Sequence, residues 1–262
     1  MDAITNQPLK ILLLGGTSEA VIAARHLATM PGIAATLSLA GRTNKAAPGP
    51  LPVRIGGFGG IAGLVDYLMR ETIDVVLDAT HPFAAQISGN AIAACAEANV
   101  PLLSIERAPW KSISGDDWRE HRDIEAAIAA LPDAPQTVFS AFGRSSIPKL
   151  TAKPQHRYVI RVVDPVDLPS ELTRATVITA RGPFRTDDDI ALFREHRVAA
   201  VLAKNSGGDA AYSKIEAARR LHLPVYIVAR APIANRQSVA TVSDALSWIA
   251  HHQASRAAER GV

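Results

Sequence analysis

A short apolar run, residues 73–77, leads directly into a segment with helical character, residues 84–98. A run this short without polar alternation is typical of a strand that is buried on both faces, as in a parallel sheet covered by helices. Ligands of such sheets bind in the crevice beyond the carboxyl ends of the strands. The stretch between the run and the helix, Asp78-Ala79-Thr80-His81-Pro82-Phe83, is therefore predicted to lie at a binding crevice.

Pro82 makes this turn stiff, because its ring fixes its own φ and disfavours helical backbone at His81. We expect the turn to hold the side chains of Thr80 and His81 at the crevice. The same six residues also fit a plain strand-to-helix turn in which Asp78 or Thr80 caps the helix.

The chain has 262 residues, which is enough for two domains of ordinary size. Hydrophobic residues make up 48% of it and aromatic residues only 5%, a balance that suits an α/β protein better than an all-β one. Two prolines within residues 132–136 mark the expected boundary, because they break helices and such segments carry few core contacts. We predict two Rossmann-like domains with doubly wound parallel sheets, residues 1–134 and 135–262, and a cleft between them.

Strand and helix signals alternate through both halves. In the first half, strands are expected at 9–14, 36–40, 53–55, 73–77, 101–105 and 118–121, and helices at 61–70, 84–98, 124–131 and in a segment ending at residue 30. In the second half, strands are expected at 137–142, 158–163, 176–180, 198–202 and 225–228, and helices at 187–196, 210–222 and 244–259.

A glycine turn follows the first expected strand, at the position of a dinucleotide-binding fingerprint. Glycines there let a pyrophosphate approach the backbone, and the next helix offers its free N–H groups. The turn differs from the usual G-x-G-x-x-G, and its hydroxyls could replace part of that grip or merely cap the helix. The predicted cofactor-binding residues of this turn are Gly15, Gly16, Thr17, Ser18 and Glu19.

The end of the second expected strand indicates which nicotinamide cofactor fits. A carboxylate there would bind the ribose hydroxyls and repel a 2'-phosphate, but the sequence has Gly41, Arg42 and Thr43 instead. A guanidinium can bind a phosphate with two hydrogen bonds, so these residues favour NADPH over NADH. A solvated basic loop is the alternative.

Several loops of the second half carry bases or glycines directly after expected strands, and together they would suit an anionic ligand. Each loop alone could be an ordinary turn with a surface base. Arg107 and Trp110 follow the strand 101–105, where a guanidinium and an aromatic ring would suit a flat, carboxylated ligand or simply form a packed loop. Lys214 is interpreted as a surface residue. The predicted substrate-binding residues are Arg107, Trp110, Gly143, Arg144, Arg181, Lys204, Asn205, Ser206, Gly207 and Gly208.

Other function classes find little support. The net charge of +3 is too small for a nucleic-acid-binding footprint, and no apolar run reaches the ~18 residues of a membrane span. No metal site is predicted, because the doublet His251-His252 stands in a terminal helix and hydrolase, Walker and zinc-protease motifs are absent. Cys95 is the single cysteine and the first residues lack a signal-peptide pattern, so a cytoplasmic protein is expected.

Three segments in this order resemble the precorrin-6A reductase family of cobalamin biosynthesis: Gly15-Gly16-Thr17-Ser18-Glu19-Ala20, Asp78-Ala79-Thr80-His81-Pro82-Phe83-Ala84 and Lys204-Asn205-Ser206-Gly207-Gly208. The pairs Ile87-Ser88 and Asn90-Ala91, with Arg107 and Trp110, also fit, and the likeness extends from about residue 10 to residue 232. The resemblance implies two Rossmann-like domains, NADPH as cofactor, and reduction of one ring double bond of precorrin-6A to give precorrin-6B. The resemblance also explains the basic residues in the predicted substrate-binding loops, since the rim of a precorrin carries many carboxylates.

The resemblance leaves several points open. His81 could donate the proton that accompanies the hydride, but we favour a role in positioning the cofactor. A cobalt-precorrin-6A reductase that uses NADH is one alternative to the proposed activity. A nucleotide-sugar transferase and a non-catalytic protein that binds NADPH or a tetrapyrrole are alternatives from other classes. For partners, the resemblance suggests transient contact with neighbouring enzymes of the pathway.

Overall fold

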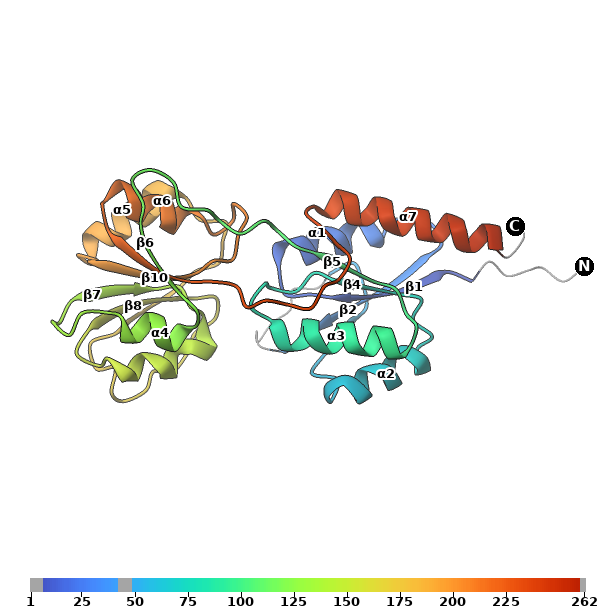
Figure 1. The fold of residues 1–262 in the computed structure, drawn as a ribbon, viewed down its shortest axis with the longest axis horizontal. Helices are drawn as coiled ribbons and strands as arrows, with labels where there is room; N and C mark the ends of the chain where they lie inside the picture. Colours follow the sequence, from blue (N-terminus) through green and yellow to red (C-terminus); the bar gives the residue numbers. More distant parts are fainter. Residues whose placement is uncertain (1–6, 42–48, 260–262) are drawn as a thin grey trace, which may run out of the picture. The chain divides into compact units, whose positions relative to one another are not determined.

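The computed structural model describes residues 7–41 and 49–259 of the chain. The chain folds into two compact units (Figure 1). The first unit combines the chain up to Arg107 with the segment from Pro232 onwards, and the second runs from Ala108 to Ala231.

The first unit is built on a six-stranded parallel sheet. Its strand order is β12-β5-β4-β1-β2-β3, which is the Rossmann order with β12 as the sixth strand. The strands are β1 (Leu9–Leu14), β2 (Ile33–Leu39), β3 (Val53–Ile55), β4 (Val75–Asp78), β5 (Leu102–Ile105) and β12 (Ser238–Val239). The helices are α1 (Ser18–Leu27), α2 (Gly60–Arg70), α3 (Ala85–Glu97) and α7 (Val242–Glu259).

Helices cover both faces of this sheet, with α1 and α7 on one face and α2 and α3 on the other (Figure 1). Successive side chains of β1 point to opposite faces. Ile11 and Leu13 pack under α1 and α7, whereas Leu12 and Leu14 pack under α2 and α3. The uninterrupted apolar run of β1 is therefore explained by burial on both sides.

The second unit repeats this architecture with the order β6-β11-β10-β7-β8-β9, again all parallel. Phe139 and Phe193 pack their rings in the core beneath α5 and α6, with ring centroids 4.8 Å apart. The strands are β6 (Asp117–His121), β7 (Thr137–Ser140), β8 (Arg157–Val162), β9 (Thr176–Thr179), β10 (Ala200–Lys204) and β11 (Pro224–Val228). The helices are α4 (Ile124–Ala129), the 3-10 helix η1 (Arg144–Ala152), α5 (Thr186–Glu195) and α6 (Ser213–Arg220).

The units do not divide at the boundary expected between residues 134 and 135. Strand β6 was expected at the edge of the first sheet but pairs with β11, and β12 returns to the first sheet beside β5. Proline-rich segments mark places with few local contacts, whereas strand pairing is decided by partners far away in the sequence. The expected ranges 1–134 and 135–262 are therefore replaced by one continuous unit and one that combines both ends of the chain.

The expected elements otherwise lie within a few residues of the observed ones, and β1 and β3 agree at both ends. Two elements were not expected. The 3-10 helix η1 contains Pro148, and β12 has only two residues, too few for a recognisable alternation.

The position of α7 predicts where the C-terminal segment contributes stability. Ile249 on α7 is fully buried with residues of β1 and α1, whereas Ile22 on α1 is 45% exposed. We expect Ile249→Ala to lower the free energy of unfolding by about 2–5 kcal/mol because it leaves a cavity. Ile22→Ala should change it by no more than about 0.5 kcal/mol. Urea unfolding followed by circular dichroism measures both, and equal effects would contradict the packing of α7 on α1.

Candidate functional site

The strand order of the first unit reverses between β1 and β4. These strands pair in register, with Leu14 opposite Asp78, so the loops that follow them leave the sheet side by side. The Ala79 amide donates a hydrogen bond to the Leu14 carbonyl (2.9 Å). The Thr17 hydroxyl donates to the Ala79 carbonyl (2.7 Å) and accepts from the Ala20 amide (3.2 Å). Thr17 thus caps α1 and fastens the glycine turn to the loop after β4.

The two glycines of the turn have different roles. A Cβ on Gly15 would lie 2.5 Å from Leu37 Cδ1, so a larger residue there would displace the end of the Leu37 side chain on β2. Gly16 has a φ of +124°, and a Cβ added there would meet no atom of residues 7–41 and 49–259 within 4 Å. Gly16 therefore borders open space at the start of α1, where a ligand can approach the backbone. Ser18 next to it is exposed and donates to Glu19 Oε2 (3.0 Å).

Asp78 organises the loop after β4. Its carboxylate is 3% exposed and accepts hydrogen bonds from the Thr80 amide (3.0 Å), the Thr80 hydroxyl (2.7 Å) and the Ser88 hydroxyl (2.7 Å). Ser88 belongs to α3, so Asp78 ties the strand end, the turn and the helix together. The alternative of a plain helix cap does not hold, because α3 begins after Ala84 without a side-chain cap.

His81 lies half-buried in this turn with a fixed ring. Its Nδ1 accepts a hydrogen bond from the Phe83 amide (3.2 Å), and its carbonyl accepts one from the Ala84 amide (2.7 Å). An Nδ1 that accepts carries no proton, so in the neutral ring Nε2 is the protonated nitrogen. The rings of His81 and Phe83 lie 5.9 Å apart, and Pro82 between them is also half-buried.

Two predicted ligand-binding side chains are bonded to each other. Arg107, expected to bind substrate, forms an ion pair with Glu19, expected to bind the cofactor, with 3.1 Å between Nη1 and Oε1. Both belong to the first unit, and their side chains are 16% and 20% exposed. The pair joins the segment after β5 to the first turn of α1. Gly41 is exposed with a φ of +73°, while Arg42 and Thr43 lie outside the described residues.

In the second unit, the loop after β10 and the segment around Trp110 form one hydrogen-bonded structure. Asn205 Oδ1 accepts from the Trp110 amide (2.8 Å), and Asn205 Nδ2 donates to the Trp110 carbonyl (3.0 Å). Trp110 Nε1 donates to the Gly208 carbonyl (2.8 Å). Gly207 has a φ of +65°, and a Cβ on it would lie 2.2 Å from the Ala108 carbonyl oxygen. The side chain of Asn205 and the backbone of Gly207 are thus used for packing.

Arg230, which the sequence did not single out, supports the same loop. It follows β11, and its guanidinium donates from Nε to the Asn205 carbonyl and from Nη2 to the Ser206 carbonyl, both at 2.9 Å. Ser206 is itself buried. The rule that selected Arg181, a base directly after a strand, would also have found Arg230.

The remaining predicted bases lie on the carboxyl edge of the second sheet. Lys204 ends β10 and donates from Nζ to the Phe142 carbonyl beyond β7 (2.7 Å). Gly143 precedes η1, and Arg144 is its first residue and exposed. Arg181 follows β9, is exposed, and lies 3.6 Å from Asp164. The loops of Lys204 and Gly143 follow neighbouring strands, whereas Arg181 follows a strand two places further along.

A buried ionic cluster lies behind these loops and was not anticipated. Arg161 on β8 forms two hydrogen bonds with Asp189 on α5, at 2.5 Å and 3.3 Å. Ser213 on α6 donates to the same carboxylate (2.6 Å). Lys214, interpreted as a surface residue, is only 4% exposed. Its position on the inner face of α6 explains the difference, because α6 packs against both α5 and the sheet.

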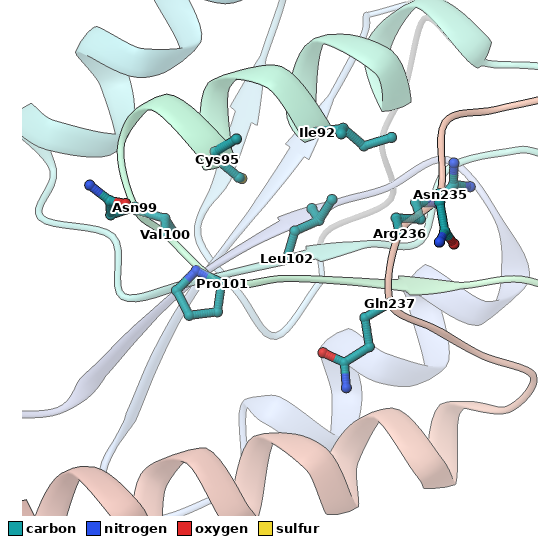
Figure 2. Close-up of a pocket in the computed structure, with 10 residues that line it drawn as sticks. Ile92, Cys95, Asn99, Val100, Pro101, Leu102, Asn235, Arg236 and Gln237 are labelled. Atoms are coloured by element: carbon teal, nitrogen blue, oxygen red, sulfur yellow. The ribbon is translucent and has the colours of Figure 1, made fainter.

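Cys95 and the pocket beside it lie away from the carboxyl ends of the strands. The pocket has a volume of about 390 Å³ and lies between α3, the start of β5 and residues 235–237 (Figure 2). Burial raises the pKa of the Cys95 thiol to about 12, so the side chain is a packed thiol at neutral pH.

Within residues 7–41 and 49–259, no group of three His, Cys, Asp or Glu could hold a metal, and no helix is both long and apolar enough to cross a membrane.

Comparison with known proteins agrees with this architecture. A family model described as precorrin-6x reductase CbiJ/CobK matches residues 10–250. The chain belongs to this family. A protein from Rhodobacter capsulatus named precorrin-6A reductase is 49% identical over 94% of this chain and 97% of its own length. A protein of the same name from Sinorhizobium is 44% identical, over 95% of this chain and 96% of its own.

A solved structure titled CobK precorrin-6A reductase has the same fold. It superimposes with a TM-score of 0.87 at 48% identity and covers 93% of this chain and 96% of its own. The predicted fold class, with two parallel α/β sheets flanked by helices, is therefore confirmed, as is the family that the motifs indicated.

Proposed function

We propose that this chain reduces one ring double bond of precorrin-6A, giving precorrin-6B, with NADPH as the hydride donor. Family membership and the names of its relatives support the reaction class and the tetrapyrrole substrate. The observation that carries the assignment of the cofactor site is Gly16, which faces open space at the amino end of α1, at the reversal point of a Rossmann-type sheet.

The residues of the first unit fit a dinucleotide. The free N–H groups of α1 bind the pyrophosphate, and Gly16 lets it approach without a Cβ in the way. Thr17 acts indirectly, because its hydroxyl is already bonded within the protein. When bound, NADPH supplies the hydride. Preference for its 2'-phosphate rests on Arg42 and Thr43, and residues 40–45 contain no carboxylate that would repel it.

The second unit binds the substrate in this proposal. A precorrin is flat and carries many carboxylates, so it requires an aromatic surface and several bases. Trp110 supplies the ring, and Arg144, Arg181 and Lys204 supply positive charge along the carboxyl edge of the sheet. Asn205, Ser206, Gly207 and Gly208 act through the shape of the loop, since much of their hydrogen bonding is internal.

His81 positions the nicotinamide in this scheme. The Phe83 amide donates a hydrogen bond to its Nδ1, which sets the orientation of the ring at the end of β4, beside the glycine turn. Holding reactants in line can contribute several kcal/mol to catalysis without any proton transfer. The proton that completes the reduction comes from water or a cofactor hydroxyl.

Anaerobic NADPH oxidation in the presence of precorrin-6A tests the function directly. We expect turnover with NADPH to exceed turnover with NADH, and Arg42→Ala to raise the KM for NADPH much more than the KM for NADH. Cobalt-loaded precorrin-6A, offered in parallel, tests the alternative substrate. Cofactor binding without turnover would indicate a carrier protein, and binding of sugar nucleotides in place of NADPH would indicate a transferase.

Substitution of Gly16 tests the cofactor site. Gly16→Ala should weaken NADPH binding at least about tenfold, the equivalent of one lost hydrogen bond to a charged group. Gly32→Ala is the matched control, because Gly32 also has a positive φ, +70°, but precedes β2 at the opposite end of the sheet. Both variants should lose some stability, and only Gly16→Ala should lose affinity in a fluorescence titration. Equal NADPH affinity in the two variants would place the cofactor elsewhere.

His81 variants separate positioning from acid catalysis. His81→Ala should reduce turnover and NADPH affinity together, whereas His81→Asn keeps a hydrogen-bonding edge and should retain substantial activity. A general acid typically contributes ~100-fold to 10,000-fold, so its loss would be clear in single-turnover rates. If His81→Asn binds NADPH normally but loses at least ~100-fold in that rate, then His81 is the acid.

A further inference from the structure

The indole ring of Trp110 lies over a buried lysine. Lys214 belongs to the first turn of α6, is 4% exposed, and places its Nζ 4.9 Å from the centre of the Trp110 ring. Its amine donates a hydrogen bond to the Ala211 carbonyl in the loop before α6. Lys214 therefore touches both parts of the structure that Asn205 holds together: the segment of Trp110 and the loop between β10 and α6.

The carboxylate of the cluster, Asp189, already accepts several hydrogen bonds. Both oxygens of Asp189 accept hydrogen bonds from Arg161, and one also accepts from Ser213. The Arg161 guanidinium lies 3.8 Å from the centre of the Phe184 ring, so it supports the loop after β9 in the same way. The described cluster thus contains two bases and one carboxylate, and each base lies against an aromatic ring of a proposed substrate loop.

We propose that Lys214 is a positioning residue that couples tetrapyrrole binding at Trp110 to uptake of one proton. This inference rests on the proposed function, since it concerns the same substrate. The protonated amine holds the indole ring by a cation–π interaction and adds positive charge behind it, and both effects favour a flat polycarboxylate. Lys214 does not act as a proton donor, because its amine is covered by the protein and bonded to a carbonyl.

Burial brings the pKa of Lys214 close to neutral pH, where uptake of a proton can accompany substrate binding. Desolvation lowers its pKa from 10.5 to about 7, with a further lowering by Arg161 from β8 and an opposing effect of Asp189 from α5. Trp110, which faces the amine from the loop after β5, does not titrate. Lys214 is therefore charged below about pH 7 and neutral above it. A bound polycarboxylate favours the charged form and raises this pKa, so substrate affinity should fall as pH rises through neutrality.

The lowered pKa of Lys214 also makes the free energy of unfolding depend on pH. The pKa of Lys214 is lower in the folded chain than in the unfolded one, so the unfolded chain binds more protons between about pH 7 and pH 10.5. The contribution of Lys214 to stability should therefore rise with pH over this range. Lys214→Met removes this contribution but keeps an apolar side chain of similar length.

The first measurement needs no ligand. Trp110 is the only tryptophan left in a Trp118→Phe/Trp248→Phe background, and its emission should change with a midpoint near pH 7 when Lys214 is present. Lys214→Met should abolish this transition. Lys149→Met is the control, because Lys149 is 41% exposed and paired with Glu125 in the same unit. Should the tryptophan variants fail to fold, the slope of unfolding free energy against pH, compared between wild type and Lys214→Met, gives the same answer.

The second measurement uses precorrin-6A without cofactor. Its affinity for wild type should fall between about pH 6 and pH 8, by at most about tenfold per pH unit for one linked proton. Lys149→Met should behave like wild type, and Lys214→Met should lose most of the dependence. A Trp110 transition with pH-independent binding would overturn the coupling, and absence of the transition would overturn the role of Lys214. If the Trp110 emission changes with pH but precorrin-6A does not bind anywhere between about pH 6 and pH 8, the proposed function is wrong. The coupling between substrate binding and Lys214 is then wrong as well.

Discussion

The pairing of β1 with β4 is the constraint on which the proposed cofactor site depends. The register that sets Leu14 opposite Asp78 brings the glycine turn and the Asp78 loop to the same edge, where the strand order reverses. The Ala79 amide and the Thr17 hydroxyl then join the two loops. A shift of one residue would turn the buried side chains of β1 to the wrong faces, so burial on both sides of the sheet fixes the site as firmly as it fixes the core.

The sequence predicted the local elements of the fold better than their pairing. Strand β1 agrees at both ends because a short apolar run bounded by turn residues is a local signal. The assignment of β6 to the second sheet and of β12 to the first depends on hydrogen bonds to β11 and β5, which no window of the sequence contains. A Rossmann sheet that takes its last strand from the far end of the chain is therefore found only in the structure.

In the candidate site, too, the sequence predicted local features better than contacts between distant residues. Position at the end of a parallel strand selected loops that lie at the carboxyl ends of the two sheets, but it did not reveal whether a side chain faces a ligand or the protein. Arg107 pairs with Glu19, and Asn205 is bonded to Trp110. Lys214 was placed on the surface because its partners lie on other elements, whereas Arg230 follows a strand directly and could have been selected by its position. Gly16 and Gly143 share a positive φ and no described atom within 4 Å of an added Cβ, so at these two positions the structure leaves room for a ligand next to the backbone.

The loops of both units are held by hydrogen bonds, and two loops of the second unit also lie against buried bases. In the first, hydroxyl and amide donors surround the carboxylate of Asp78, and the turn that carries His81 is fixed by short hydrogen bonds. In the second, the aromatic rings of Trp110 and Phe184 lie against buried bases, one of which titrates near neutrality. Hydride transfer tolerates little misalignment of the donor, which favours a rigid cofactor loop. The proposed substrate is a large anion that must be bound and released, and in our proposal the buried Lys214 adjusts its charge to that ligand without a change of fold.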